Sequence, residues 1–308
     1  MRQALLRLET NHPAWTFFLL CLGIAWPFVI LHALTLTGNL GLHSSVSQGL
    51  LIGFAQFSPS LAAVLLVLNR HGLSGLRRFL KRIIQVPKHP PWLLVAILLP
   101  LFTVATSIGI ILLTPLAEPD FQSVSLVLVL PYYLVSLILG LLFGGLSEEL
   151  GWRGYLLPVL QRKHSALVAG IIVGLFWGVW HLDAETMLVP LFNEGVGAFL
   201  SATVSGYGIR LISDVATAIL MVWLFNETAG SLLPAILFHS SINAAQTAAV
   251  AMWTDFPFAG ELIYYGLKWL IVLVLIALMG WQSLSKNRTK YVATDINVTK
   301  LEPVQILV

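Results

Sequence analysis

Charged side chains are scarce in this sequence. Of its 308 residues only 10% are Asp, Glu, Lys or Arg, whereas a soluble domain carries roughly 25%. Apolar residues make up 57% of the chain, and the mean hydropathy is +0.87. This composition excludes an ordinary soluble protein and indicates a polytopic membrane protein in a lipid bilayer. The net charge of +3 does not indicate a nucleic acid partner, because the Lys and Arg residues lie in loops between apolar runs.

Cysteine is almost absent as well. The single residue of this type, Cys21, lies in an apolar run, which excludes an intrachain disulfide and favours simple packing. Arg2 and Arg7 precede the first apolar stretch, but no small-residue cleavage site follows, so this stretch is predicted to stay as a span. Internal repeats and linkers are also lacking. We therefore expect one membrane domain over residues 1–308.

About eight apolar segments are long enough to cross a bilayer, since a span needs about 20 residues. They lie near 14–36, 49–68, 92–114, 131–159, 166–185, 208–226, 230–250 and 262–282. Lys and Arg gather in the loop at 69–91, in the turn at 160–165 and in the tail at 285–308. Loops on the opposite side have neither residue up to position 206. The positive-inside rule then predicts that both termini are cytoplasmic, and we expect the polar tail to be disordered.

Two adjacent carboxylates, Glu148 and Glu149, lie inside one of the most apolar parts of the chain. Ser147 could cap a helix there, with both acids in its first turn at a membrane interface. The depth argues against this interpretation. Glu148 precedes the expected helix end at Leu160 by about 12 residues, which places it roughly 18 Å from that end. Ionisable groups at such depth usually line a polar cavity or take part in chemistry.

Three more polar residues are expected at a similar depth. His181 lies roughly 21 Å beyond the start of the next span, and His239 and Asn243 lie roughly 14 and 20 Å into the seventh. The last two are four residues apart and share a helical face. Each alone could be an ordinary interhelical hydrogen bond. Together with Glu148, they favour one polar intramembrane cavity.

The same residues carry a family resemblance. The stretch from Glu148 to Arg153 fits E-E-x-x-x-R, His181 ends an F-x-x-x-H-like pattern, and His239 with Asn243 fits H-x-x-x-N. Together the motifs resemble the CPBP family of intramembrane proteases, which contains the type II CAAX prenyl endopeptidases and bacterial Abi-like proteins. The resemblance covers about residues 125–250. One departure is Trp177, which stands where the pattern has Phe and is expected to preserve a packing aromatic.

The resemblance implies an all-α fold with a cavity open to the cytosol and the membrane, and peptide-bond hydrolysis there. Amide hydrolysis needs an activated water, a stabilised oxyanion and a proton for the leaving amine. Glu148 is predicted to be the general base, and His181 to orient the water or relay a proton. His239 and Asn243 suit an oxyanion hole.

Two further interpretations concern the residues around this core. Glu149 and Arg153, four residues apart, are predicted to brace the helix, either as a purely structural ion pair or with a supporting part in catalysis. Glu148, His181 and His239 could instead bind zinc with an open position. Asn243 beside His239 favours a metal-free site that requires no cofactor.

Other function classes explain part of the pattern. A proton-coupled transporter would also bury Glu and His, but no matched pair of broken helices marks the two halves. A non-catalytic immunity or scaffold protein could retain the fold. For a protease, the resemblance implies a membrane-anchored substrate, either a lipidated CAAX-like peptide or a leader-type segment. It also indicates a bacterial source.

Overall fold

The described part of the chain is almost entirely helical. The computed structural model describes residues 2–41, 44–114, 116, 126–182, 187–250, 257–294 and 296–306. Its α-helices are α1 Arg2–Asn11, α2 Pro13–Leu36, α3 Ser45–Gln56, α4 Ser58–Lys81, α5 Pro91–Leu112, α6 Leu126–Gly140, α7 Ser147–Glu149, α8 Leu157–Leu160, α9 Ala166–Trp180, α10 Val189–Glu194, α11 Val196–Ala202, α12 Gly208–Glu227, α13 Leu233–Val250 and α14 Phe258–Met279. Wider π-helical turns occupy η1 Leu141–Leu146, η2 Leu150–Leu156 and η4 Thr203–Tyr207. The all-α, polytopic prediction is confirmed.

The number of spans differs from the prediction. By length and composition, five helical stretches in the described residues can cross a membrane: α2, α5, Val127–Leu160, α12 and α14. The pair α3 and α4, bent by 46°, makes a sixth. The predicted total of about eight was therefore too high by this measure, although every predicted span coincides with a helix. α9 has 15 residues and spans only roughly 22 Å, and α13 carries several polar side chains. Both pack against other helices, α9 on α12 and α13 on α5 and α6, so lipid does not set their length or polarity.

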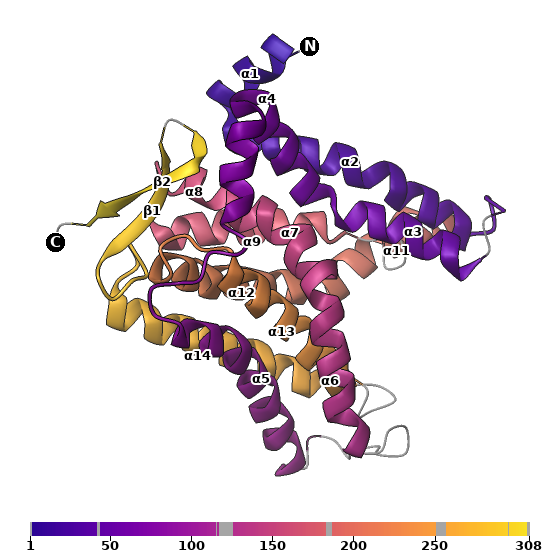
Figure 1. Cartoon of the computed structure of the whole chain (residues 1–308). Helices are drawn as coiled ribbons and strands as arrows, with labels where there is room; N and C mark the ends of the chain where they lie inside the picture. Colours follow the sequence, from indigo (N-terminus) through magenta and orange to yellow (C-terminus); the bar gives the residue numbers. More distant parts are fainter. Residues whose placement is uncertain are drawn as a thin grey trace.

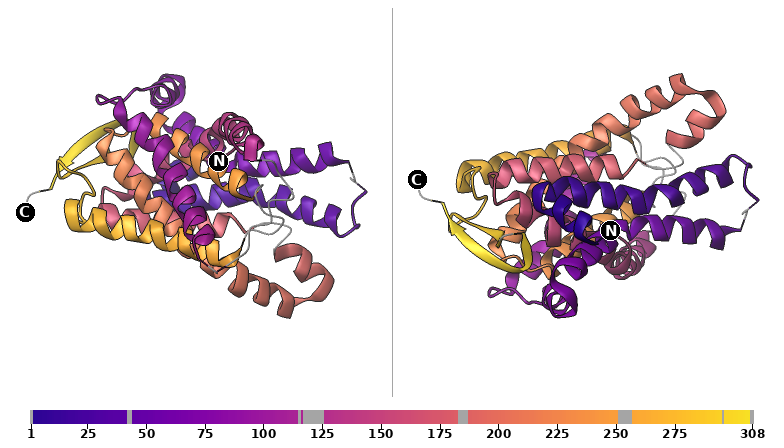
Figure 2. Two further views of the ribbon diagram at one scale, coloured as in Figure 1. Left: turned by 90° about the horizontal axis from the view of Figure 1, so that it is seen from below. Right: turned by 90° about the horizontal axis from the view of Figure 1, so that it is seen from above.

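The helices form a bundle with one extended side. In Figure 1, α13 crosses the middle of the molecule between α5, α6 and α14. Figure 2 shows α2 and α3 projecting together to one side, away from the C-terminal hairpin. α9 and α12 lie in close contact because Gly174 has no side chain. A Cβ at this position would stand 2.6 Å from the Cα of Val215.

The stretch Val127–Leu160 is interrupted in the middle. Phe143 has φ −95° and ψ 97°, and Gly144 has φ 117° and ψ −74°, so neither is helical. The chain becomes helical again at once, and the N–H of Gly144 donates to the Oγ of Ser147 at 2.7 Å. This is the contact from the third helical residue back to the cap that closes a helix N-terminus. The break therefore starts a new helix inside the bundle, one turn before Glu148.

The described part of the C-terminal tail forms regular structure, contrary to the prediction of a disordered segment. Strands β1 Thr289–Thr294 and β2 Asn297–Gln305 form an antiparallel hairpin. Its inner face buries Ala293 and Val298, and it packs beside α8 and α4 (Figure 1). The prediction failed because the tail's few apolar residues are too scattered to reveal a strand, yet they meet an apolar surface of the bundle.

A buried arginine joins this hairpin to the bundle. Arg82, only 7% exposed, donates to the carbonyl oxygens of Gly154 at 2.9 Å, Gly230 at 3.0 Å and Val298 at 3.2 Å. Three segments distant in the sequence thus meet at one guanidinium. Hydrogen bonds to a charged donor contribute roughly 1.5–3 kcal/mol each, so the hairpin is firmly attached.

Candidate active site

The two adjacent carboxylates are buried where the interrupted span resumes. Glu148 is 2% exposed and Glu149 is fully buried, both in α7. They belong to the first turns after the break at Gly144, where free backbone N–H groups favour negative charge. The sequence interpretation of acids near a helix N-terminus therefore holds locally, but this terminus lies within the bundle and not at its surface.

Glu148 is held from two sides. The indole N–H of Trp177 donates to its Oε2 at 2.7 Å, and the Nε2 of His239 lies 3.8 Å from its Oε1. One carboxylate oxygen is therefore fixed by α9, while the other faces α13. This geometry orients the carboxylate and leaves Oε1 directed towards the imidazole.

Glu149 links two residues through a single oxygen. Its Oε1 accepts from the Nη1 of Arg153 at 2.9 Å and lies 2.7 Å from the Nδ1 of His239. The structure thus contains the predicted contact between Glu149 and Arg153. It also contains a hydrogen bond from His239 on α13 to Glu149 on α7, which residue spacing within a single helix could not predict. Since Nδ1 is bound by Glu149, the ring of His239 is fixed with Nε2 towards Glu148.

All four predicted catalytic residues line one cavity of about 550 Å³. Glu148, His181, His239 and Asn243 reach it from α7, the end of α9 and α13, as the depth estimates predict. Further polar side chains come from α3, α12, α13 and α14. They are Gln56, Arg210, Ser213, Asp214, Thr217, Gln246, Glu261, Tyr265 and Lys268. The predicted polar intramembrane cavity is present, and the individual roles of its residues stay predictions.

A second cavity adjoins the first at the carboxylate. Its volume is about 220 Å³, and it lies among α2, α3 and the end of α9. Most of its lining is apolar, but Gln56, Glu148 and His181 line both cavities. Glu148 therefore stands at the boundary between a polar space and an apolar one.

His181 faces a carboxylate that the motifs do not include. Its Nδ1 lies 3.8 Å from the Oδ2 of Asp214, and the Nε of Arg210 is 3.8 Å from the same oxygen. Arg210 and Asp214 are four residues apart on α12, a spacing that lets them face each other, but nothing in the sequence places His181 beside them. This cluster forms the α12 wall of the polar cavity.

α14 contributes a cation that sequence reasoning missed. Lys268 is 4% exposed and donates to the backbone oxygen of Ser213 at 3.3 Å and to the Oγ1 of Thr217 at 2.9 Å. It lies in the last apolar span and outside every motif. Only its presence as a lone Lys in that span could have indicated a buried role.

Gly144 makes room for the α13 side chains. A Cβ here would stand 2.6 Å from the Nδ2 of Asn243 and 3.3 Å from the Nε2 of His239. The positive φ of 117° also disfavours any other residue. The break in the span therefore brings bare backbone against the two groups predicted to form the oxyanion hole.

Replacing Gly144 by Ala should disrupt this arrangement. The added methyl must displace Asn243, so we expect at least a 100-fold lower rate of peptide hydrolysis, comparable to the loss of one oxyanion donor. Circular dichroism should show unchanged helix content. Gly109→Ala is the control, because a Cβ there meets nothing within 4 Å. Full activity of the Gly144 variant would show that Asn243 need not occupy its observed position.

Trp177 has a role beyond packing that sequence reasoning missed. It was predicted to be a packing aromatic in place of Phe, but its N–H bonds Glu148. Its ring also lies 4.9 Å from the Arg153 guanidinium carbon, 5.2 Å from the ring of His181 and 5.3 Å from that of His239. Trp177 thus contacts each part of the site, which Phe could do only in part.

The Trp177→Phe variant isolates the hydrogen bond to Glu148. It keeps an aromatic ring beside Arg153 and removes the donor. A bond to a charged group contributes roughly 1.5–3 kcal/mol, so kcat should fall about 10- to 100-fold with KM nearly unchanged. Trp223→Phe, in a buried tryptophan that packs on Trp92, is the matched control. An equal loss in both variants would assign the effect to packing.

The residues present do not fit the zinc alternative well. Glu148 and His239 approach each other, but the Nδ1 of His181 faces Asp214. Within the described ranges, no group of three or more His, Cys, Asp or Glu side chains is disposed to hold a metal ion.

The arrangement suits the activation of a water molecule. A buried carboxylate, fixed by one indole, can accept a proton from water at its other oxygen. The imidazole of His239 and the amide of Asn243 lie close together on one face of α13. The amide N–H of Asn243 can donate to a developing oxyanion, and so can the Nε2 of His239 when the ring is protonated, since its Nδ1–H is used by Glu149. Positive charge from Arg153 is neutralised by Glu149, which leaves Glu148 as the chemically available carboxylate.

Comparison with known proteins is consistent with this site. Residues 130–245 match the family of Rce1-like type II CAAX prenyl endopeptidases, which confirms the resemblance found from the three motifs. The chain is also 32% identical over 111 residues to CAAX prenyl protease 2 of Methanococcus maripaludis. That match covers 34% of this chain and 38% of the relative's length. Every motif residue lies inside the matched family region, whereas Gln56 and Lys268 lie outside it.

Proposed function

Because residues 130–245 match the family of Rce1-like type II CAAX prenyl endopeptidases, we propose that the chain is an intramembrane endopeptidase. One observation carries the proposal. Glu148 is buried at the edge of a polar cavity, held by Trp177 and beside His239 and Asn243. A scaffold would not need an oriented carboxylate facing two potential donors.

The proposed reaction uses water as the nucleophile. Glu148 accepts a proton as the water oxygen bonds to the carbonyl carbon of the scissile peptide. Asn243 and the protonated ring of His239 donate to the oxyanion that forms, and His181 orients the water from the opposite wall. When the C–N bond breaks, the proton held by Glu148 passes to the leaving amine. The products are a carboxylic acid and an amine, with no covalent enzyme intermediate.

The two adjoining cavities favour an amphiphilic substrate. Peptide groups would lie in the polar cavity, and an apolar group next to the cleaved bond would occupy the space among α2, α3 and α9. A membrane-anchored peptide, CAAX-like and lipidated or of leader type, has this chemistry. A water-soluble peptide would leave the apolar cavity unfilled and should be a poorer substrate.

The orientation in the membrane is also proposed. The basic segments at 69–91, 160–165 and the tail come together at one end of the bundle, where Arg82 binds Val298 and Lys290 binds the carbonyl of His164. The positive-inside rule then favours a cell-membrane protein with this end and both termini in the cytoplasm.

Cleavage assays with purified protein in liposomes test the function. We expect hydrolysis of prenylated C-terminal peptides, slower hydrolysis of the same peptides without lipid, and no effect of a metal chelator. Loss of activity with chelator and recovery with zinc would instead make Glu148, His181 and His239 metal ligands. If folded protein cuts no lipidated, plain or leader-type peptide, the immunity or scaffold alternative replaces the enzyme.

A further inference from the structure

One residue at the boundary between the two cavities at Glu148 has no part in the proposed reaction. Gln56 is the last residue of α3, and together with Glu148 and His181 it lines both the polar cavity and the apolar one. Within the described part of the chain, no other residue lines both. Gln56 lies outside residues 130–245, so the family match gives it no role.

The bend between α3 and α4 brings this residue to the site. The two helices are bent by 46° at their junction, and Pro59 stands in the first turn of α4. Proline has no N–H to donate, and its ring clashes with the carbonyl four residues earlier, so a straight helix cannot continue through this point. α3 therefore ends at Gln56, whose side chain lies in the wall of both cavities.

Hydrogen bonds fix the bend to the elements that carry the proposed catalytic groups. The hydroxyl of Ser60 donates to the carbonyl of Leu146 at 2.7 Å, directly before α7. The indole N–H of Trp180, the last residue of α9, donates to the Oγ of Ser58 at 2.9 Å. The segment that follows Gln56 is therefore bound to α7 and to α9.

Close packing on both sides of the interrupted span adds to this attachment. Gly151 lies so near Pro59 that a Cβ at the glycine would stand 2.6 Å from the proline carbonyl. Phe57 contacts Phe143 edge to face, with ring centroids 6.1 Å apart. Gln56 is consequently held in a defined position relative to the carboxylates of α7.

The carboxamide of Gln56 is available to a ligand. Its side chain is partly exposed, and it forms no hydrogen bond with any residue that the structure describes. A carboxamide has two N–H donors and an acceptor oxygen. A peptide group likewise has one donor and one acceptor, and both need partners when they leave water. The free amide is therefore complementary to a backbone peptide group.

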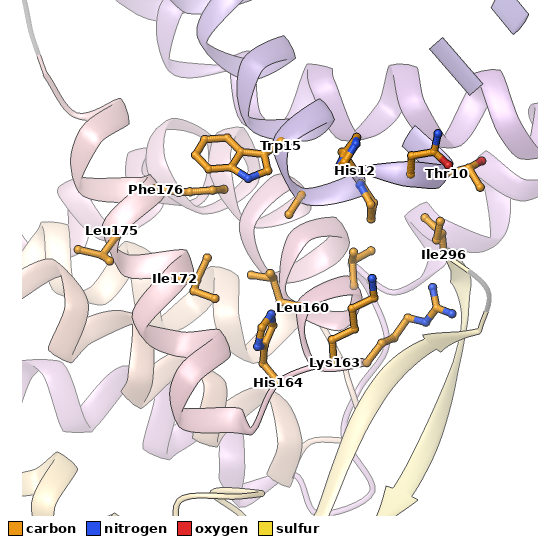
Figure 3. Close-up of a pocket in the computed structure, with 15 residues that line it drawn as sticks. Thr10, His12, Trp15, Leu160, Lys163, His164, Ile172, Leu175, Phe176 and Ile296 are labelled. Carbon is orange, nitrogen blue, oxygen red and sulfur yellow. The ribbon is translucent and has the colours of Figure 1, made fainter. Parts of the chain in front are cut away.

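A third pocket lies too far from Glu148 to bind the bond that is cut. It has a volume of about 420 Å³ and lies between the α1–α2 junction and the turn from α8 to α9, where Figure 3 shows Trp15 beside Phe176. It shares no lining residue with the two cavities at Glu148. The peptide next to the scissile bond therefore has to lie at the boundary where Gln56 stands.

We propose that Gln56 binds the substrate backbone at the peptide group next to the scissile bond, on the side of the apolar anchor. The Oε1 of Gln56 accepts from the N–H of that peptide group. This contact holds the anchor in the apolar cavity and the scissile carbonyl beside Glu148. The inference rests on the proposed protease function and adds a substrate-binding residue from outside the family region.

Peptide binding to the full-length Glu148→Gln variant tests this contact without hydrolysis. A fluorophore-labelled, prenylated C-terminal peptide in detergent gives Kd by fluorescence anisotropy. Adding Gln56→Leu should weaken binding about tenfold, because the peptide N–H is then buried without an acceptor. Adding Gln48→Leu instead makes the same change about two turns earlier on α3, outside both cavities, and should leave Kd unchanged.

An ester analogue of the peptide removes the N–H and needs no change at Gln56. The ester should weaken binding about tenfold in the Glu148→Gln protein and have little effect once Gln56→Leu is added, since the contact is already lost. An equal effect of the ester in both proteins, or unchanged binding after Gln56→Leu, would overturn the proposal. The expected pattern with a peptide that the native chain does not cleave would support the Gln56 contact and overturn the protease.

Discussion

Glu148→Gln should abolish peptide hydrolysis while leaving the protein folded. The amide has the shape of the carboxylate and can still accept from Trp177 at one oxygen, but it cannot take a proton from water. General base catalysis contributes roughly 10²- to 10⁴-fold, so the residual rate should be near the detection limit. Single-turnover cleavage in liposomes measures the effect without interference from product release.

The control for this variant is Glu261→Gln. Glu261 also lines the polar cavity, but its carboxylate lies near Tyr265 on α14 and has no contact with His239. We expect its rate of peptide hydrolysis to change by less than about threefold, as for a substitution away from the reacting groups. Retained activity in Glu148→Gln, or an equal loss in both variants, would contradict the assignment of Glu148 as the base.

Arg153→Leu should have the largest effect on stability. The substitution removes the cation from a completely buried pair and leaves Glu149 charged beside His239 alone. Breaking a buried ion pair from one side typically destabilises by about 3–5 kcal/mol. The melting temperature in detergent should therefore fall by on the order of 10 °C, and the yield of folded protein should fall with it.

A double variant separates the pair from the packing of its side chains. Glu149→Gln combined with Arg153→Leu removes both charges, while the amide oxygen can still accept from the Nδ1 of His239. Its stability should exceed that of Arg153→Leu alone. If the stability losses of the single variants Glu149→Gln and Arg153→Leu simply add in the double variant, the two residues do not interact and the brace interpretation is wrong. Recovery of stability without recovery of activity would give the pair a part in catalysis as well as in structure.

The positions of the site residues could be predicted because helices advance regularly. A constant rise per residue relates sequence distance to depth, and i, i+4 spacing identifies a shared face. Glu148, His239 and Asn243 therefore come together as expected. The same assumption of a regular helix is why the break at Phe143 and Gly144 was not predicted. The expected span at 131–159 was treated as continuous, but the backbone leaves the helical conformation at these two residues.

Contacts between elements were harder to predict than positions along them. Nothing in the sequence near Trp177 indicates that its N–H reaches a carboxylate 29 residues away. The link from Glu149 to His239 likewise depends on how α7 and α13 are oriented about their axes. The difference between about eight predicted spans and the five or six helical stretches that meet the length and composition criteria has a related cause, since α9 and α13 also pack against other helices and apolar length alone does not describe them.

The attachment of the tail through Arg82 has a consequence for biosynthesis. Val298 follows Arg82 by 216 residues, so at about 5–20 residues per second the ribosome supplies this carbonyl roughly 10–40 s after the arginine. During that interval the guanidinium lacks one of its three partners and the hairpin surface of α4 and α8 stays uncovered. A prematurely terminated chain would remain in that state. The guanidinium of Arg82 therefore gains its third partner only after the hairpin has been synthesised.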